Sequence, residues 1–245
     1  MNFKGIGTFT ILALLTFSVG ASQQKSICGQ DDRVPSTNPK IGRLLENITA
    51  GGGCTLTMIS KSCAITAGHC SNTFGIAEFN TPASIGGRIQ HPEAKDIYPV
   101  LKDQSKWVYT GIGSDWAVLK VGANTETGLF AGDVQGFYEV DFATPKVGEM
   151  VRITGYGLDR NDPTRNLAQQ THNGEVTRVR GSAMYHVADT MGGNSGSTII
   201  RESDDKIIAI HTNGGCSRRG GANSATTLAN KQKLQDAIKA CLATE

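Results

Sequence analysis

The chain has 245 residues, with 24 Lys and Arg against 22 Asp and Glu, and its formal net charge is +2. A nucleic-acid-binding protein is expected to concentrate basic residues on one face and to supply aromatic side chains that stack on bases. Here the charges are mixed along the sequence and only 6% of the residues are aromatic. Composition therefore argues against a nucleic-acid partner.

The N-terminus has the pattern of a secretory signal peptide. Lys4 precedes an apolar stretch over residues 9–19, which ends in the small residues Gly20 and Ala21. A membrane-spanning helix needs ~20 apolar residues, and neither this stretch nor any later segment reaches that length. The expected parts are a signal peptide, a short pro-segment and an exported domain without a membrane anchor, at 1–21, 22–27 and 28–245.

Cysteine usage agrees with export to the medium or, in a bacterium, to the periplasm. An even number of cysteines in an oxidising compartment predicts three disulfides. A zinc site is the competing use, but the sequence has no close Cys-x-x-Cys pair, so we expect no metal and no cofactor. The six cysteines all follow the signal peptide, at Cys28, Cys54, Cys63, Cys70, Cys216 and Cys241.

Short β-branched or alternating runs between turn signals predict a β-rich domain, and the 30 glycines fit such a chain. Two pairs of runs are separated by short polar bends, at 60–61 and 202–206, and read as hairpins. This spacing suits a barrel or a sandwich. The expected strands lie at 55–59, 62–66, 116–121, 150–154, 175–179, 197–200 and 207–211.

One helix is predicted near the C-terminus, over residues 230–242. Asn230 is the expected N-cap, and apolar residues then recur at helical spacing along one face. These are Leu234, Ala237, Ile238, Cys241 and Leu242.

Three separate segments supply the groups that nucleophilic hydrolysis of an amide requires: a base, a group that orients it, and a hydroxyl near oxyanion donors. His69 follows a β-branched strand, Asp115 precedes an apolar strand, and Ser195 lies in the sequence Gly192-Gly193-Asn194-Ser195-Gly196. Each segment alone is commonly a turn or a packed residue. Together they fit one mechanism.

In this order the three segments resemble the chymotrypsin-like serine peptidases, and specifically their glutamyl endopeptidase branch. The resemblance runs from Cys28 through the C-terminal helix. It implies an all-β fold of two six-stranded antiparallel β-barrels packed together, with a C-terminal α-helix. The implied bounds are about 40–125, about 140–228 and about 230–242 for the first barrel, the second barrel and the helix.

The resemblance also implies roles for single residues. Ser195 would be the nucleophile, His69 the general base and acid, and Asp115 the carboxylate that orients the imidazole. The backbone N–H groups of Gly193 and Ser195 would form the oxyanion hole, where glycine lets the peptide turn its N–H to the site. An α/β-hydrolase esterase conflicts with this reading, because that fold carries its triad in the order Ser, Asp, His.

Disulfide pairing is likewise carried over. Cys54–Cys70 resembles the family's bridge across the hairpin that frames the histidine. Cys63–Cys241 follows from the family's packing of its C-terminal helix against the strand that leads to the histidine. Cys28–Cys216 is the remaining pair, and it would tether the N-terminal segment beside the substrate pocket.

Two features of the pocket sequence conflict. Asp189 resembles the carboxylate with which trypsin-type enzymes select Lys or Arg. Thr190 and His211 resemble the branch that binds a substrate glutamate through a hydroxyl and an imidazole. We favour cleavage after Glu, with Asp also accepted. Cleavage after Lys or Arg stays an alternative, and His211 could instead be a core histidine at a strand end.

Departures from the family pattern bear on activation. Asn194 replaces the aspartate that pairs with a new N-terminal ammonium in the digestive enzymes, so that ion pair is not available. We hypothesise trimming to Ser26 or Ile27, which would bring a new amino group near the pocket. Thr212 is either a hydrogen-bond partner of Asp115 or a strand residue without that role, and it is not counted in the triad.

The expected product is a monomer that acts on proteins or peptides. A secreted pseudo-protease, which keeps the barrels as a binding module without turnover, is the main alternative from another functional class.

Overall fold

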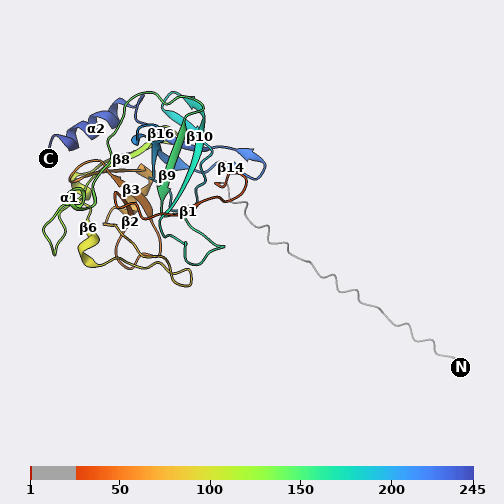
Figure 1. Ribbon diagram of the computed structural model, residues 1–245, viewed down its shortest axis with the longest axis horizontal. Helices are drawn as coiled ribbons and strands as arrows, with labels where there is room; N and C mark the ends of the chain where they lie inside the picture. The colour runs from red at the N-terminus through yellow and green to blue at the C-terminus, as the bar shows by residue number, and fades with distance from the viewer. Residues whose placement is uncertain (2–25) are drawn as a thin grey trace.

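The computed structural model describes residues 26–245 of the chain, so most of the expected signal peptide and pro-segment, within residues 2–25, lies outside the described residues. The described part is built from two seven-stranded antiparallel sheets, a two-stranded hairpin and two short α-helices (Figure 1). This arrangement, with a helix at the C-terminus, confirms the expected all-β fold.

The second sheet in the chain closes into a six-stranded barrel, because β9 pairs with both β10 and β12. The strand β1 adds a short extension on β10. Apolar side chains from β9, β12, β13 and β16 fill its interior. The strands are β1 (Val34–Pro35), β9 (Met150–Gly155), β10 (Gln170–Arg180), β11 (Ala183–His186), β12 (Thr198–Arg201), β13 (Lys206–Asn213) and β16 (Asn223–Thr227).

The first sheet is a less complete barrel, with the order β6-β5-β2-β3-β4-β8-β7. Its strands are β2 (Ile41–Leu45), β3 (Cys54–Met58), β4 (Cys63–Thr66), β5 (Ile76–Glu78), β6 (Ile97–Pro99), β7 (Lys106–Tyr109) and β8 (Asp115–Lys120). Beyond β6, closure rests on a single bridge between Val100 and Val121. The strand β6 ends at Pro99, which has no N–H to continue a ladder. The first barrel is therefore partly open, with β7 as a seventh strand.

The remaining elements are short. They are the 3-10 turns η1 (Gly68–Thr73), η2 (Ala94–Asp96) and η3 (Lys102–Gln104), the helix α1 (Ala131–Gln135), and the hairpin strands β14 (Cys216–Ser217) and β15 (Gly220–Gly221). Within the described residues, no helix combines the length and apolar character needed to cross a bilayer.

The C-terminal helix α2 spans Gln232–Leu242 and buries Leu234, Ala237 and Ile238, as its spacing predicts. The expected N-cap is wrong. Lys231 occupies that position without a side-chain bond that caps the helix, and Asn230 instead donates its amide N–H to the Gly181 carbonyl at 3.1 Å. A bond to a distant turn replaced the local capping bond that the sequence pattern suggested.

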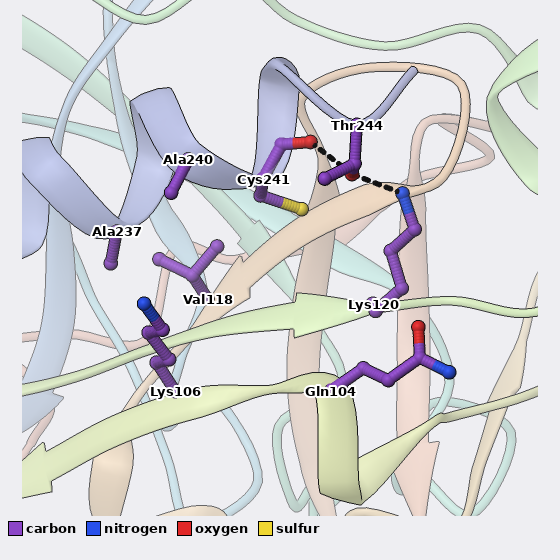
Figure 2. A pocket seen from close by; sticks show the side chains of 8 residues that line it. All are labelled: Gln104, Lys106, Val118, Lys120, Ala237, Ala240, Cys241 and Thr244. Atoms are coloured by element: carbon purple, nitrogen blue, oxygen red, sulfur yellow. Dashed lines mark hydrogen bonds between the residues drawn. The ribbon is translucent and has the colours of Figure 1, made fainter.

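A pocket lies beneath the end of α2, where the helix faces β7 and β8 (Figure 2). Lys120 Nζ donates to Thr244 Oγ1 at 2.8 Å across its rim. None of the expected catalytic or substrate-binding residues lines it. Its lining is Gln104, Lys106, Val118, Lys120, Ala237, Ala240, Cys241 and Thr244.

Three disulfides connect the parts. Cys54–Cys70 joins β3 to η1, Cys63–Cys241 joins β4 to α2, and Cys28–Cys216 joins the N-terminal segment to β14. These are the pairs that the resemblance implied.

Candidate active site

His69, Asp115 and Ser195 come from three elements that meet at the junction of the two barrels. His69 lies in η1 directly after β4, and Asp115 is the first residue of β8. Ser195 lies in the loop that precedes β12, and its carbonyl accepts the Thr55 N–H from β3 at 2.9 Å. A loop of the second barrel is thereby fixed against a strand of the first.

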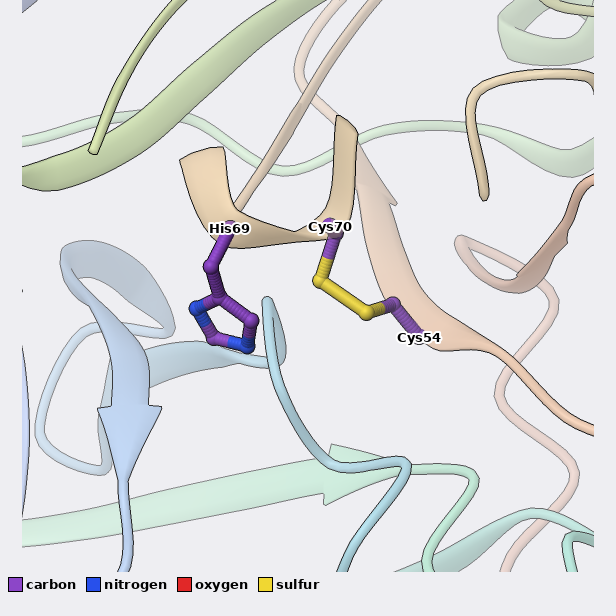
Figure 3. Close-up of side chains that lie close together, drawn as sticks. All are labelled: Cys54, His69 and Cys70. Atoms are coloured by element: carbon purple, nitrogen blue, oxygen red, sulfur yellow. A yellow bond between two sulfur atoms is a disulfide. The ribbon is translucent and has the colours of Figure 1, made fainter. Parts of the chain in front are cut away.

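Asp115 holds His69 by two hydrogen bonds. Its Oδ2 lies 2.6 Å from His69 Nδ1, and its Oδ1 accepts the His69 backbone N–H at 2.9 Å. Asp115 is fully buried, so the carboxylate places the imidazole proton on Nδ1 and leaves Nε2 as the basic nitrogen. Figure 3 shows that the imidazole and the Cys54–Cys70 disulfide extend from neighbouring residues of η1.

Close backbone packing explains why a glycine precedes His69. A Cβ at Gly68 would lie 2.1 Å from the Val108 carbonyl oxygen and 2.8 Å from that of Trp116. Only glycine lets η1 approach the β7–β8 hairpin this closely. This close approach brings His69 to the N-terminal end of β8, where Asp115 is the first residue.

The turn that carries Ser195 is closed by Asn194. The Asn194 side-chain oxygen accepts the Met191 N–H at 3.1 Å, and the Asn194 N–H donates to the Met191 carbonyl at 2.9 Å. Among the described residues Ser195 Oγ has no hydrogen bond to His69 Nε2. Catalytic hydrogen bonds are often long in unliganded enzymes and shorten when substrate binds.

The N–H groups of Gly193 and Ser195 donate to no acceptor within the described residues. Gly193 has φ 101°, and a Cβ there would lie 2.2 Å from the Tyr156 carbonyl oxygen. The adjoining Gly192 carbonyl accepts the Leu158 N–H at 2.7 Å. Two neighbouring backbone donors are therefore free beside the serine, as an oxyanion hole requires.

Thr190 and His211 provide buried polar groups near the serine loop. Thr190 Oγ1 is buried without a hydrogen-bond partner among the described residues. His211 Nδ1 lies 3.2 Å from His186 Nε2. Burial lowers the pKa of His186 to about 4, and burial, then His186 and His69, hold the pKa of His211 well below its usual value. Both imidazoles are therefore neutral at neutral pH.

Asp189 binds the N-terminal segment. It is almost fully buried, and its two oxygens accept the backbone N–H groups of Cys28 at 2.7 Å and Asp32 at 3.1 Å. Burial raises the pKa of this carboxyl, and those two N–H groups partly offset the rise. Both of its oxygens are thus occupied, which leaves less of the carboxylate available to pair with a substrate Lys or Arg.

The sequence profile described as Trypsin matches residues 29–237, which is most of the chain. The chain belongs to the trypsin family. This confirms the resemblance to chymotrypsin-like serine peptidases.

Individual relatives agree with the family assignment. The chain is 29% identical over 204 residues to the glutamyl endopeptidase of Bacillus licheniformis, covering 78% of this chain and 61% of that protein. It is 29% identical over 131 residues to the glutamyl endopeptidase of Staphylococcus aureus strain MRSA252, covering 52% of this chain and 35% of that protein. The match thus spans less than two thirds of either relative.

A solved structure of a Glu endopeptidase shares the fold, with a TM-score of 0.68 and 22% identity, and the alignment covers 89% of this chain and 99% of that one. At this identity the likeness supports the fold alone.

Sequence reasoning missed two buried residues of this trypsin-family site. His186, which no sequence motif singled out, lies against His211. Asn223 donates its amide N–H groups to the carbonyls of Ser26 at 2.8 Å and Ala188 at 2.9 Å, and accepts the Gly215 N–H at 3.0 Å. It connects the N-terminal segment to two pocket walls. Both residues lie in strands whose neighbours depend on the barrel's strand order, which local patterns do not encode.

Of the two roles considered for Thr212, the structure shows that of a residue in β13. Its hydroxyl donates to the Ser224 carbonyl at 3.3 Å, whereas the Asp115 backbone N–H donates to Thr226 Oγ1 at 3.3 Å. Thr212 lies at an irregularity in the pairing of β13 with β16, between His211 and Asn213.

Two groups of side chains have the spacing of metal ligands, but their donors do not fit an ion. Cys54 and Cys70, beside His69, form a disulfide and offer no thiolate. In the group of Asp32, His172 and Asp189, His172 Nδ1 already accepts the Asp189 N–H at 2.8 Å. Neither group therefore offers a full set of free donor atoms for a metal ion.

Proposed function

We propose that this trypsin-family serine endopeptidase is exported and cleaves peptide bonds after Glu, and also after Asp, through an acyl-enzyme at Ser195. The observation that supports the acidic preference is that the second barrel buries both a Thr190 hydroxyl without a partner among the described residues and a neutral His211, while the N-terminal segment occupies Asp189. Peptides and proteins are the substrates that the family implies.

In the proposed mechanism Ser195 Oγ attacks the substrate carbonyl carbon while its proton passes to His69 Nε2. The carbonyl π electrons move to oxygen, where the N–H groups of Gly193 and Ser195 stabilise the charge. As the C=O bond reforms, the C–N bond breaks and the amine leaves with the proton from His69. Water then attacks the ester by the same route, which releases the acid and restores Ser195.

A substrate carboxylate needs donors in a site of low dielectric constant. Only one proton can lie between His186 Nε2 and His211 Nδ1. If His186 donates it, His211 carries its own proton on Nε2 and can donate that to the substrate. The Thr190 hydroxyl supplies a second donor. Both of these donors are neutral. After trimming, the new amino group would be a third donor to the substrate carboxylate.

Trimming to Ser26 or Ile27 is part of the proposal. The Ser26 carbonyl accepts the Thr190 N–H at 3.1 Å and the Asn223 amide N–H at 2.8 Å. A chain that begins at either residue would place its ammonium beside the pocket. Retention of full activity by protein that still begins at Ser22 would contradict trimming as a requirement.

Export is supported by the signal pattern at 1–21 and by the three disulfides, which persist in oxidising compartments. The division into a pro-segment at 22–27 and a peptidase domain at 28–245 belongs to the same proposal. We further propose a monomer without a nucleic-acid partner or a membrane anchor.

The decisive test is digestion of a defined protein by the purified mature enzyme beside Ser195→Ala, with cut sites read by mass spectrometry. Cuts after Glu that are absent with Ser195→Ala are the expected result. Thr190→Val, which removes a hydroxyl at nearly constant volume, should lower kcat/KM for Glu substrates about 10- to 100-fold and spare substrates with Gln in that position.

Other outcomes identify the alternatives. Cuts after Lys or Arg would keep the triad and refute the acidic pocket. A well-folded protein that neither cleaves nor reacts with a fluorophosphonate probe at Ser195 would favour the binding module.

A further inference from the structure

Arg33 is a buried cation supplied by the N-terminal segment. It is only 3% exposed, and its Nε and Nη2 donate to the two Asp31 carboxylate oxygens at 2.8 and 2.7 Å. Its third nitrogen, Nη1, donates to the Leu158 carbonyl at 3.1 Å. Burial of a guanidinium is costly unless it is paired and hydrogen-bonded. The three hydrogen bonds offset that cost, and together they fix the orientation of the guanidinium.

Leu158 connects this guanidinium to the oxyanion loop. Its carbonyl accepts from Arg33, while its N–H donates to the Gly192 carbonyl at 2.7 Å. The peptide unit between Gly192 and Gly193 is planar and trans. When its oxygen is held toward Leu158, its N–H must point to the opposite side, where Gly193 offers a free donor.

The guanidinium also lies against the turn that carries the nucleophile. A Cβ at Gly157 would be 2.7 Å from Arg33 Nη1 and 2.1 Å from Asn194 Oδ1. Only a glycine fits between the arginine and the asparagine, so the two side chains flank the same backbone position. Asn194 carries no charge, and the carboxylates that pair with the cation are Asp31, 2.7 Å from Nη2, and Asp159, 4.0 Å from the same nitrogen.

We propose that Arg33 is a positioning residue for the oxyanion hole, which it orients through Leu158 and the Gly192–Gly193 peptide. The inference rests on the proposed role of Gly193 as an oxyanion donor. The segment over residues 26–33 then serves both halves of the site, because Ser26 contacts the pocket at one end and Arg33 contacts Leu158 at the other. Because Asn194 is uncharged, it cannot form an ion pair with a new N-terminal ammonium. When the segment docks, the Arg33 guanidinium supplies a cation beside the turn of Asn194 instead.

The test compares Arg33→Gln with Arg201→Gln. Arg201 is a matched control because it is also largely buried and pairs with both oxygens of Asp204, at 2.9 and 2.6 Å, yet its side chain bonds to no residue of the site. Arg33→Gln should lower kcat about 10- to 100-fold, less than the ~100- to 1000-fold loss of an oxyanion donor itself. KM should stay within about twofold, and Arg201→Gln should leave both constants unchanged.

A second readout separates positioning from folding. A peptide boronic acid with Glu at its boron-bearing residue bonds to Ser195 and places an oxygen in the oxyanion hole, so its Ki should rise in step with the loss in kcat. Arg33→Lys, which can reach one acceptor, should recover part of kcat. Asp31→Asn leaves Arg33 in place without the carboxylate that aims it, and it should show a smaller loss of kcat at near-normal melting temperature.

Failures of the two proposals are distinguishable. A folded Arg33→Gln variant with normal kcat and boronate Ki, or one whose entire loss is in KM, would overturn the role of Arg33 and leave the proposed function standing. If the wild-type enzyme instead cuts after Arg, the acidic preference fails and the same kcat comparison is made on Arg substrates. An inactive wild-type protein would refute both proposals.

Discussion

The two barrels hold their parts of the site by different means. In the first barrel, His69 and Asp115 are 46 residues apart and bond directly, and the Cys54–Cys70 bridge beside them spans only 16 residues. In the second barrel, the pocket depends on the N-terminal segment, through bonds from Cys28 to Asp189 and from Asn223 to Ser26 that span 161 and 197 residues. The His69–Asp115 pair is formed by two residues of one barrel, whereas the contacts of Asp189 and Asn223 require a docked segment from outside the second barrel.

Asp115→Asn tests the self-contained half and should have the largest effect. The amide would present an N–H to His69 Nδ1, which favours the tautomer whose Nε2 already carries a proton and cannot accept one from Ser195. We expect kcat to fall about 10,000-fold with little change in the melting temperature or in KM. Steady-state kinetics with a Glu substrate measures this, and a loss below about tenfold would contradict the role of Asp115 as the orienting group.

Asp189→Asn tests the segment-dependent half. Replacing one carboxylate oxygen by an NH2 group loses an acceptor for the N–H groups of Cys28 and Asp32, so the segment should dock less firmly. A hydrogen bond to a charged group contributes about 1.5–3 kcal/mol, which predicts a rise in KM for Glu substrates of about 10- to 100-fold.

Two observations complete that prediction. Amide hydrogen exchange at Cys28 and Asp32 should become faster, whereas Asp96→Asn, which alters a buried carboxylate of the first barrel, should leave it unchanged. If Asp189 selects Lys or Arg instead, Asp189→Asn would abolish cleavage after those residues and spare exchange in the segment.

The histidine pair in the pocket should give the second barrel a distinctive pH dependence. Burial holds the pKa of His186 at about 4 and that of His211 well below its usual value, while the unfolded chain binds these protons from about pH 6.5 downward. The free energy of unfolding should therefore fall as pH falls from 6.5 toward 4, by roughly 3 kcal/mol for His186. Above pH 6.5 this contribution is complete.

Urea unfolding at several pH values, with His186→Gln as the comparison, measures that slope. The variant should show a flatter decline between pH 6.5 and 4. Asp189, whose pKa is raised by burial, contributes with the opposite sign, since this carboxyl takes up its proton at a higher pH in the folded protein than in the unfolded chain. Parallel curves for the two proteins would contradict the assignment to His186.

The same division explains what the sequence could predict. The hairpins at 60–61 and 202–206 depend on neighbouring residues, so strand patterns were sufficient for them. The proposed triad roles came instead from motifs that resemble the family's. The position of Asp189 in the sequence resembles that of a substrate-binding carboxylate, but it could not reveal that both oxygens accept backbone N–H groups, from Cys28 and Asp32. His186, Asn223 and Arg33 gave no local signal, because their partners are set by strand order and by docking of a distant segment.

The smallest expected effect concerns the helix that joins the chain's end to the first barrel. Replacing an N-cap Asn by Ala usually costs about 1 kcal/mol, but Asn230 caps no helical N–H and its partly exposed bond to Gly181 is a single neutral contact. Asn230→Ala should therefore change the free energy of unfolding by about 0.5 kcal/mol or less. Leu234→Ala should cost about 2–5 kcal/mol, because Leu234 is fully buried against the first barrel's core. Urea unfolding of these two variants measures both costs, and the expected result would show that the apolar face holds α2 in place. A cost above 1 kcal/mol for Asn230→Ala would instead indicate that Asn230 caps the helix.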